Sequence, residues 1–171
     1  MASVVTHTSP TVSAEPPSPA RFRELFRTHP AGVVVVTLDA GRGPVGFTAT
    51  SFTSASLHPP LVSFGVATQG SSWPHLRDAA TVVVNLLGAD QEPLARRFAT
   101  SGVDRFAAPT RWRRLPGGEP VLEGARGWLR VAVVNLVAAG DHRLVLGRLE
   151  ESYLSEDRRP LVYHDGRYCS L

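Results

Sequence analysis

A run of small hydroxyl side chains is the densest group of candidate chemical residues in this sequence. Hydroxyls both donate and accept hydrogen bonds, so such a run suits a phosphate group or the polar edge of a ring. A solvated strand face has the same composition, and the residues alone leave both interpretations open. On an extended chain Thr48 and Thr50 would share one face, while Ser51 and Thr53 would face the other way. The run comprises Thr48, Thr50, Ser51, Thr53, Ser54 and Ser56.

A second polar pair, Ser71-Ser72, precedes a short predicted helix with Pro74 in its first turn. Ser72 is the predicted N-cap, and the helix would run through Leu76 to Ala79. Unpaired N–H groups and the helix dipole favour negative charge at such a terminus. Ordinary helix capping explains the same pair, so the anion site is one of two interpretations.

A glycine-rich segment, Gly41–Gly46, matches the dinucleotide-binding pattern G-x-G-x-x-G. That mechanism needs a helix to begin there, and the residues that follow, Phe47–Phe52, are a poor helix start. The expected acidic residue about 20 positions later is also missing, because no Asp or Glu lies between Asp39 and Asp78. We therefore interpret this segment as a hairpin turn.

The histidines support neither a metal site nor a hydrolase. Asp141 and His142 are adjacent, but no G-x-S-x-G nucleophile motif accompanies them. His142 and His164 could meet across strands, yet the six histidines show no metal-binding spacing. We predict no metal, and the plainest role for His142 is a hydrogen bond to Asp141.

Positive charge is concentrated in one part of the chain. All 18 basic residues are Arg, and residues 96–130 hold 8 of them against 3 acidic residues. Such a segment favours either a nucleic acid or a phosphate-bearing ligand. Trp112 is the only large aromatic residue within Arg111–Arg114, whereas single-strand binders usually interleave stacking aromatics with charge. We therefore expect no nucleic-acid partner.

The length of 171 residues predicts one domain over residues 20–171 after a disordered tail, residues 1–19, rich in Ser, Thr and Pro. The single cysteine, Cys169, excludes an intrachain disulfide and fits a reducing cytosol. No apolar run approaches the ~20 residues of a membrane span, and the N-terminal segment lacks the features of a signal peptide. We expect a cytoplasmic protein without membrane association.

The elements that would position these side chains are mainly strands, because short β-branched runs separated by turn residues dominate the sequence. Strand and helix do not alternate regularly, so an antiparallel barrel with two or three short helices is favoured over a parallel sheet. Asp165-Gly166 is a strong two-residue turn signal. The expected strands are Val33–Leu38, Val45–Thr53, Leu61–Val66, Thr81–Leu87, Gly127–Ala139, His142–Leu149, Leu161–Tyr163 and Arg167–Cys169; the expected helices are Arg21–Arg27, the segment after Ser72, and one capped by Asp90 that includes Phe98.

The ordered set of motifs resembles the flavin reductase family, the small NAD(P)H-dependent components of two-component flavin monooxygenases. The resemblance runs from Phe22 to the C-terminus, and no single motif carries it. The motifs are Pro30–Thr37, Gly46–Ser54, Ser56–Val62, Val84–Leu87 with Asp90-Gln91, Leu94–Ala99, Asp104–Phe106, Gly140–His142 and Pro160–Tyr168.

This resemblance implies a mainly β protein, an antiparallel split β-barrel of the FMN-binding type, usually a homodimer with the flavin near the subunit interface. It implies FMN or FAD and NADH or NADPH as cofactors, and a flavin-dependent monooxygenase as partner. His142 would orient the nicotinamide, and Tyr163, His164 and Tyr168 are weaker candidates on that side. Flavin-binding positions would be Thr48, Ala49, Thr50 and Ser51, with Thr68, Ser71 and Ser72 on the ribityl-phosphate side and Phe98, Arg105 and Phe106 closing over the ring.

Two alternative functions remain open at this point. A flavoprotein with tightly bound FMN could act directly on its own small substrate, and it would purify yellow without releasing reduced flavin. A basic nucleic-acid-binding barrel is the remote alternative, and its affinity would fall steeply with salt.

Overall fold

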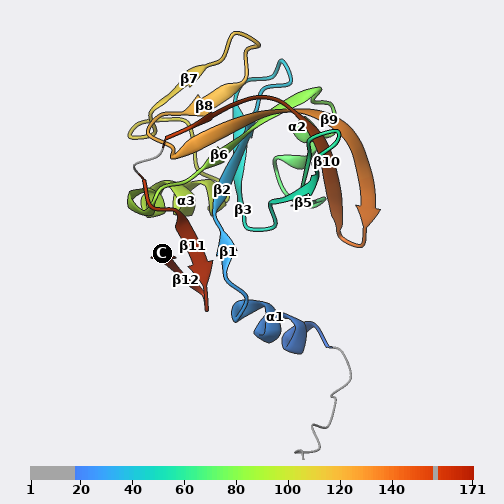
Figure 1. The fold of residues 1–171 in the computed structure, drawn as a ribbon, viewed down its shortest axis with the longest axis vertical. Helices are drawn as coiled ribbons and strands as arrows, with labels where there is room; N and C mark the ends of the chain where they lie inside the picture. The colour runs from blue at the N-terminus through green and yellow to red at the C-terminus, as the bar shows by residue number, and fades with distance from the viewer. Residues whose placement is uncertain (1–17, 156–157) are drawn as a thin grey trace, which may run out of the picture.

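A computed structural model describes residues 18–155 and 158–171. The predicted tail, residues 1–19, therefore lies almost entirely outside the described residues. The first helix, α1 (Pro19–Arg27), begins after Ser18, whose hydroxyl accepts a hydrogen bond from the Arg21 amide. It confirms the helix expected over Arg21–Arg27 and projects from the body of the protein (Figure 1).

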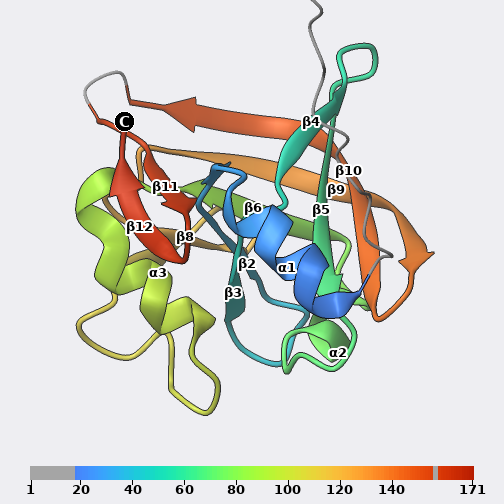
Figure 2. The same ribbon diagram turned by 90° about the horizontal axis from the view of Figure 1, so that it is seen from below.

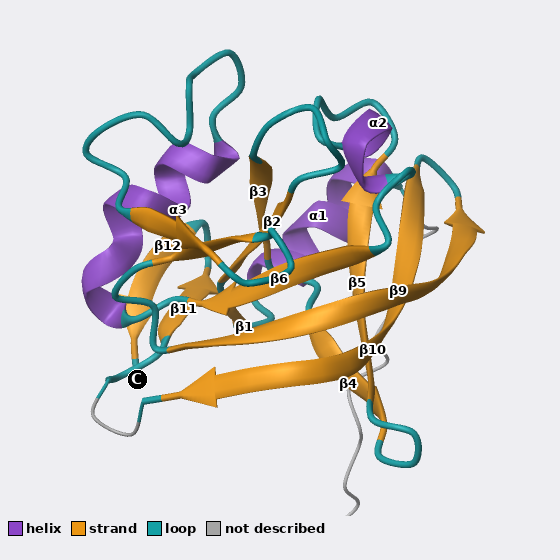
Figure 3. Cartoon of the chain, turned by 90° about the horizontal axis from the view of Figure 1, so that it is seen from above, coloured by secondary structure: helices purple, strands orange, loops and turns teal. Residues whose placement is uncertain are grey.

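Seven antiparallel strands form the main sheet in the order β3-β2-β6-β9-β10-β5-β4. The long strands β9 and β10 curve around the body and carry most of the sheet's bend (Figures 1 and 3). The edge strands β3 and β4 do not pair, so the sheet stays open along one side, as a split barrel requires. The strands are β2 (Val34–Leu38), β3 (Val45–Ala49), β4 (Thr53–Ser56), β5 (Leu61–Ala67), β6 (Thr81–Leu86), β9 (Gly127–Ala139) and β10 (His142–Leu154).

A second sheet of three short strands, in the order β1-β11-β12, joins the barrel through its first strand. The chain passes from β1 (Ala31–Gly32) through Val33 into β2, so one segment serves both sheets. The strands β11 (Leu161–His164) and β12 (Arg167–Ser170) form the hairpin expected at Asp165-Gly166. Both turn residues have positive φ, as a tight two-residue turn demands.

The valine-rich run at β2 is buried on both faces, which explains its lack of alternation. Val34 and Val36 face the barrel interior beside Phe64 and Val131. Val35, on the opposite face, packs with Phe98 in the layer between the barrel, α3 (Glu92–Ala99) and the small sheet. One strand thus joins two hydrophobic cores.

The helices differ from the sequence expectation in how they begin. Helix α2 (Trp73–Leu76) is a single turn that ends before Ala79, and Ser72 makes no capping hydrogen bond with its side chain. Asp90 lies inside the 3₁₀ turn η1 (Ala89–Gln91) instead of capping α3. A 3₁₀ turn often precedes an α-helix and displaces its first residue, and spacing alone does not reveal this.

A hairpin of β7 (Trp112–Arg114) and β8 (Pro120–Leu122), which the sequence did not predict, lies inside the Arg-rich segment. Buried polar groups hold it to the barrel, because Thr37 donates to the Pro120 carbonyl at 2.5 Å and Asn85 accepts from the Leu122 amide at 2.8 Å. Strand β10 also extends to Leu154, past the predicted end at Leu149.

Candidate functional site

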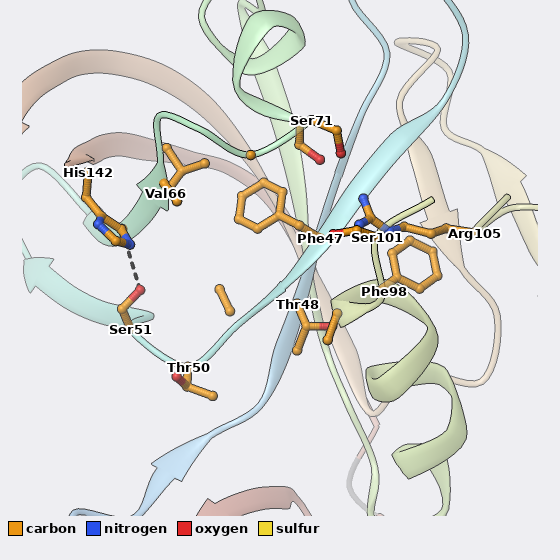
Figure 4. Close-up of a pocket in the computed structure, with 16 residues that line it drawn as sticks. Phe47, Thr48, Thr50, Ser51, Val66, Ser71, Phe98, Ser101, Arg105 and His142 are labelled. Carbon is orange, nitrogen blue, oxygen red and sulfur yellow. Dashed lines mark hydrogen bonds between the residues drawn. The ribbon is translucent and has the colours of Figure 1, made fainter. Parts of the chain in front are cut away.

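A cavity of about 480 Å³ opens beside β3 and β5, on the unpaired side of the barrel (Figure 4). Its volume is typical of sites for small molecules and cofactors. The walls combine apolar side chains with hydroxyls, and a guanidinium and an imidazole lie at opposite sides of the view in Figure 4. The lining includes Phe47, Thr48, Ala49, Thr50, Ser51, Gly65, Val66, Ser71, Ser72, Phe98, Ser101, Arg105 and His142.

The Ser/Thr segment faces this cavity with consecutive residues. Strand β3 ends at Ala49, so the chain turns before the alternation of an extended strand reaches Ser51. Thr48, Thr50 and Ser51 therefore all line the cavity, and the expected split between the two faces is wrong. The Ser51 hydroxyl accepts a hydrogen bond from the Gly65 amide at 2.9 Å, which fixes this turn against β5.

Thr48 connects the cavity wall to the neighbouring helix. Its hydroxyl donates to the Ala95 carbonyl of α3 at 2.6 Å, and this bond holds β3 against α3. Phe98, on the same helix, is fully buried yet its ring borders the cavity. Gly46 makes this packing possible, because a Cβ there would lie only 2.8 Å from Phe98 Cε1.

Arg105 supplies a positive charge at one side of the cavity. Its guanidinium donates to the Gly46 carbonyl at 2.8 Å and to the Thr100 carbonyl at 2.8 Å, which fixes its position. Within residues 18–155 and 158–171 it forms no ion pair with a carboxylate, and burial lowers its pKa. Arginine nevertheless stays protonated, so this partly desolvated charge favours an anionic ligand.

Ser71 and Ser72 lie on the same cavity but not as a helix-terminal anion site. Helix α2 is one turn long, and the buried Ser72 hydroxyl is within 3.4 Å of the Gly46 carbonyl, to which it donates. Ser71 is exposed and faces the cavity in Figure 4. Ser71, Ser101 and Arg105 are thus polar groups that line the cavity on this side.

His142 borders the opposite side of the cavity (Figure 4). Its Nδ1 lies 2.7 Å from Asp141 Oδ1, and this hydrogen bond is the main cause that lowers the pKa of Asp141. An ionised carboxylate only accepts hydrogen bonds, so Nδ1 carries a proton and Nε2 of the neutral ring is an acceptor. The hydrogen bond to Asp141 expected from the sequence is present, and the ring still lines the cavity.

Two predicted positions lie outside the cavity lining. The Thr68 hydroxyl donates to the Asp141 carbonyl at 2.9 Å, so it ties the end of β5 to the turn before β10. Phe106 stands behind Phe98, with ring centroids 5.3 Å apart, and packs on Trp112 as well. His164 is paired with Arg167 in the small sheet and does not meet His142 across strands.

Several residues that were not predicted from the sequence also line the cavity, chiefly Phe47, Gly65 and Ser101. Phe47 lies inside the quoted Gly46–Ser54 motif, which could have indicated it. Gly65 is informative only in three dimensions, because a Cβ there would lie 3.4 Å from Ser51 Oγ and 3.8 Å from His142 Cδ2. No sequence signal distinguishes Ser101 from an ordinary loop serine.

The arrangement suits a flat ring with polar edges and an anionic tail. Phe47 and Val66 offer apolar surface, the hydroxyls of Thr50 and Ser51 offer hydrogen bonds, and Arg105 offers charge. The absent Cβ at Gly65 keeps the cavity wall free of an atom that would touch both Ser51 and His142. A flavin has this combination of flat ring, hydrogen-bonding edge and phosphate, and the donor set fits it.

Among the described residues, no helix has the length and apolar character needed to span a bilayer. The same residues bring together no group of three or more His, Cys, Asp or Glu side chains able to hold a metal ion.

Comparison with known proteins identifies the family. An NADH:FMN oxidoreductase of Rhodococcus qingshengii is 48% identical over 96% of this chain and 92% of its own length. The reductase subunit of a flavin-dependent monooxygenase from Rhodococcus jostii is 31% identical over 94% of this chain and 82% of its own. An NADH:FAD oxidoreductase of Streptomyces globisporus, solved with NAD and FAD fragments, has a TM-score of 0.86 at 35% identity and covers 92% of this chain and 97% of its own. The model of the flavin reductase like domain matches residues 26–171, and the chain belongs to this family.

Proposed function

We propose that this protein is an NAD(P)H:flavin oxidoreductase that reduces FMN or FAD and supplies the reduced flavin to a separate monooxygenase. The observation that carries the proposal is that Arg105 and His142 line opposite sides of one cavity, with a row of hydroxyls between them. Relatives named as reductase subunits of monooxygenase systems support the same role.

Seven lining residues have a defined task in this proposal. Ser51 and Thr50 hydrogen-bond the polar edge of the flavin, and Arg105 with Ser71 binds its phosphate. Phe47 and Val66 cover one face of the ring and exclude water from it. His142, held by Asp141, offers Nε2 to the carboxamide of the nicotinamide and so orients it. Bound flavin supplies the hydride acceptor, and the protein supplies orientation.

The exposure of the site favours a flavin that leaves after reduction. Thr50, Ser51, Ser71 and His142 are all exposed, so the bound ring would keep a route to solvent. A tightly held prosthetic group is usually enclosed instead. We therefore propose that the flavin is a diffusing substrate, and that a direct flavoprotein oxidoreductase is the second candidate.

We also propose the preferred nucleotide and flavin, the oligomeric state and the cellular compartment. We propose NADH and FMN as the preferred pair, because a relative at 48% identity is named for both. We also propose a homodimer, since Phe22, Leu25 and Phe26 of α1 are 55–61% exposed and need a covering surface. The free, exposed Cys169 suits a reducing cytoplasm.

The decisive experiment is a steady-state assay of NADH and NADPH oxidation with FMN, FAD and riboflavin. Turnover in which reduced flavin passes to cytochrome c or oxygen across a dialysis membrane supports the diffusible role. If only the flavin that copurifies with the protein is reduced and none is released, the second candidate, a flavoprotein with tightly bound flavin, is favoured. No oxidation with any pair rejects the reductase. Sedimentation at twice the chain mass of 18.4 kDa would support the homodimer.

A further inference from the structure

The loop that joins α3 to β7, residues 100–111, contains neither helix nor strand. Figure 2 shows this loop beside α3, in yellow-green at the lower left of the view. Holding each residue of such a segment in one conformation costs entropy, so bonds to the loop must offset that cost. Arg105 belongs to this loop and lines the cavity (Figure 4), so the conformation of the loop determines where the guanidinium lies.

The residue before Arg105 holds the backbone of the loop with its side chain. Asp104 Oδ1 accepts a hydrogen bond from the Phe106 amide at 3.0 Å and another from the Ala107 amide at 3.1 Å. Carboxylates of Asp often stabilise a turn in this way, by accepting from the amides that follow them. One oxygen of Asp104 therefore fixes the chain immediately after Arg105.

Two side-chain donors fix the main chain at Asp104 and Arg105 as well. Nη2 of Arg97, on α3, donates to the Asp104 carbonyl at 2.6 Å. The Thr110 hydroxyl donates to the Arg105 carbonyl at 2.7 Å. The first bond ties the loop to the helix, and the second joins two parts of the loop. Arg105 is thus held through its own backbone and through both of its neighbours.

The carboxylate of Asp104 leaves the charge of Arg105 without a counterion. In the part of the chain that the structure describes, no ion pair joins these two side chains, although they are adjacent in sequence. Arg105 donates to backbone carbonyls instead, and Asp104 accepts from backbone amides. Neutral carbonyls do not cancel a guanidinium charge, so that charge stays available to an anionic ligand.

We propose that Asp104 is a positioning residue for Arg105, whose guanidinium it places to meet the phosphate of the flavin. The consequence is a preference for phosphorylated flavins over riboflavin. The proposal rests on the proposed function and deepens it, because it concerns how the flavin is selected. Asp104 does not line the cavity beside β3 and β5, so it acts through Arg105 and not on the flavin itself.

A purely electrostatic role for Asp104 predicts different results. A negative charge next to Arg105 would repel the phosphate, so removing the charge by any substitution would strengthen FMN binding. Positioning depends on the acceptor oxygen and not on the charge. Asp104→Asn keeps an oxygen for the same two amides, whereas Asp104→Ala removes it. Asp104→Glu keeps the charge but displaces the acceptor by one methylene group.

The test titrates FMN and riboflavin separately against each variant without nucleotide, followed by flavin fluorescence. Asp104→Ala should raise the Kd for FMN about fivefold, because the loop loses two hydrogen bonds, and should change the Kd for riboflavin less than about twofold. Asp104→Asn should restore the wild-type Kd for FMN, and Asp104→Glu should raise it about threefold. In steady-state kinetics Asp104→Ala should raise the KM for FMN and leave kcat at saturating flavin nearly unchanged.

Asp39→Ala is the matched control, because Asp39 Oδ1 likewise accepts from two amides, those of Gly41 at 2.9 Å and Gly43 at 3.1 Å. These bonds stabilise the turn between β2 and β3, and Asp39 does not line the cavity. The control should lower the thermal unfolding temperature and leave the ratio of the two flavin Kd values unchanged. A similar change of that ratio in Asp39→Ala would reduce the effect of Asp104 to general destabilisation and overturn the inference.

Three other results also overturn the inference. They are tighter FMN binding in both Asp104→Ala and Asp104→Asn, an equal loss of FMN and riboflavin affinity in Asp104→Ala, and a wild-type protein that binds FMN no more tightly than riboflavin. Asp104→Glu decides between position and charge if Asp104→Ala does not fold. A wild-type protein that binds FMN but oxidises neither NADH nor NADPH rejects the proposed function, while the titrations still decide the role of Asp104.

Discussion

The backbone amide of Gly65 donates a hydrogen bond to the hydroxyl of Ser51 at 2.9 Å. Strand β4 pairs with β5 in the register Thr53 to Ser63, and continuing this register would place Ser51 opposite Gly65. The ladder stops before that point, and the Ser51 side chain takes the place of a backbone acceptor. The barrel thus stays open beside Gly65, where the cavity forms.

Gly65→Ala tests this opening. The added Cβ would lie 3.4 Å from Ser51 Oγ and 3.8 Å from His142 Cδ2, which are ordinary contact distances. The fold should therefore tolerate the methyl group, while kcat/KM for NADH falls about tenfold because the reacting rings are displaced. Gly32→Ala is the control, since a Cβ there meets nothing within 4 Å. Equal activity in both variants would reject the role of Gly65.

Neutralising Arg105 should weaken flavin binding. Arg105→Gln should raise the KM for FMN at least tenfold, because a charge-assisted hydrogen bond contributes about 1.5–3 kcal/mol. The effect on riboflavin, which lacks the phosphate, should be smaller. Steady-state kinetics at two salt concentrations measure both. The exposed Arg113 provides the control variant Arg113→Gln. A similar rise in the KM for FMN in this control would mean that the net positive charge of the protein, and not Arg105 itself, attracts the flavin.

His142 should act on the nicotinamide side of the reaction. His142→Ala should lower kcat/KM for NADH about tenfold and leave flavin affinity nearly unchanged, because the ring orients the donor. Asp141→Asn should have a smaller effect, since an amide oxygen still accepts from Nδ1. Comparing the two variants in stopped-flow reduction measures the difference. A larger loss in Asp141→Asn than in His142→Ala would contradict the assignment.

The buried carboxylate of Glu119 should make stability fall in acid. Burial alone would raise its pKa, but hydrogen bonds from Thr81 and Arg130 outweigh this and hold the pKa below its usual range. A lowered folded pKa gives stability that is present above the unfolded pKa of about 4.3 and lost as pH falls through the folded value.

Glu119→Gln should therefore flatten the dependence of unfolding free energy on pH between pH 7 and pH 3. At pH 7 the variant should lose about 3 kcal/mol, because Arg130 keeps its charge without a partner. Urea unfolding at several pH values measures both effects. Glu123→Gln, which removes an exposed partner of Arg111, should change stability by less than about 0.5 kcal/mol. An unchanged pH slope in Glu119→Gln would exclude this carboxylate as the cause.

Gly46→Ala should damage the fold and not only the site. A Cβ at Gly46 would lie 2.8 Å from both Phe98 Cε1 and the Val36 carbonyl oxygen, too close for either to remain in place. The expected loss is about 1–3 kcal/mol, typical of overpacking in a core. Thermal unfolding measures it. A variant of wild-type stability would show that Phe98 moves freely.

Local sequence patterns were sufficient to predict most of the strands and the tight turn at Asp165-Gly166. Val33–Leu38 and Leu61–Val66 are β-branched or apolar runs, and short runs of this kind bounded by turn residues favour strands. Asp165-Gly166 determines its turn because only residues that tolerate positive φ fit there. The ordered motifs also indicated the family and most of the cavity lining.

The tertiary structure decided which hydroxyls face the cavity. Ser51 shares a wall with Thr48 and Thr50 only because β3 ends at Ala49, and that end is fixed by pairing with β2. The resemblance placed Thr68 and Phe106 at the flavin as well, yet the Thr68 hydroxyl donates to the Asp141 carbonyl and the Phe106 ring packs on Trp112. Composition and spacing determine strands because they act locally, whereas a site depends on contacts between residues far apart in the chain.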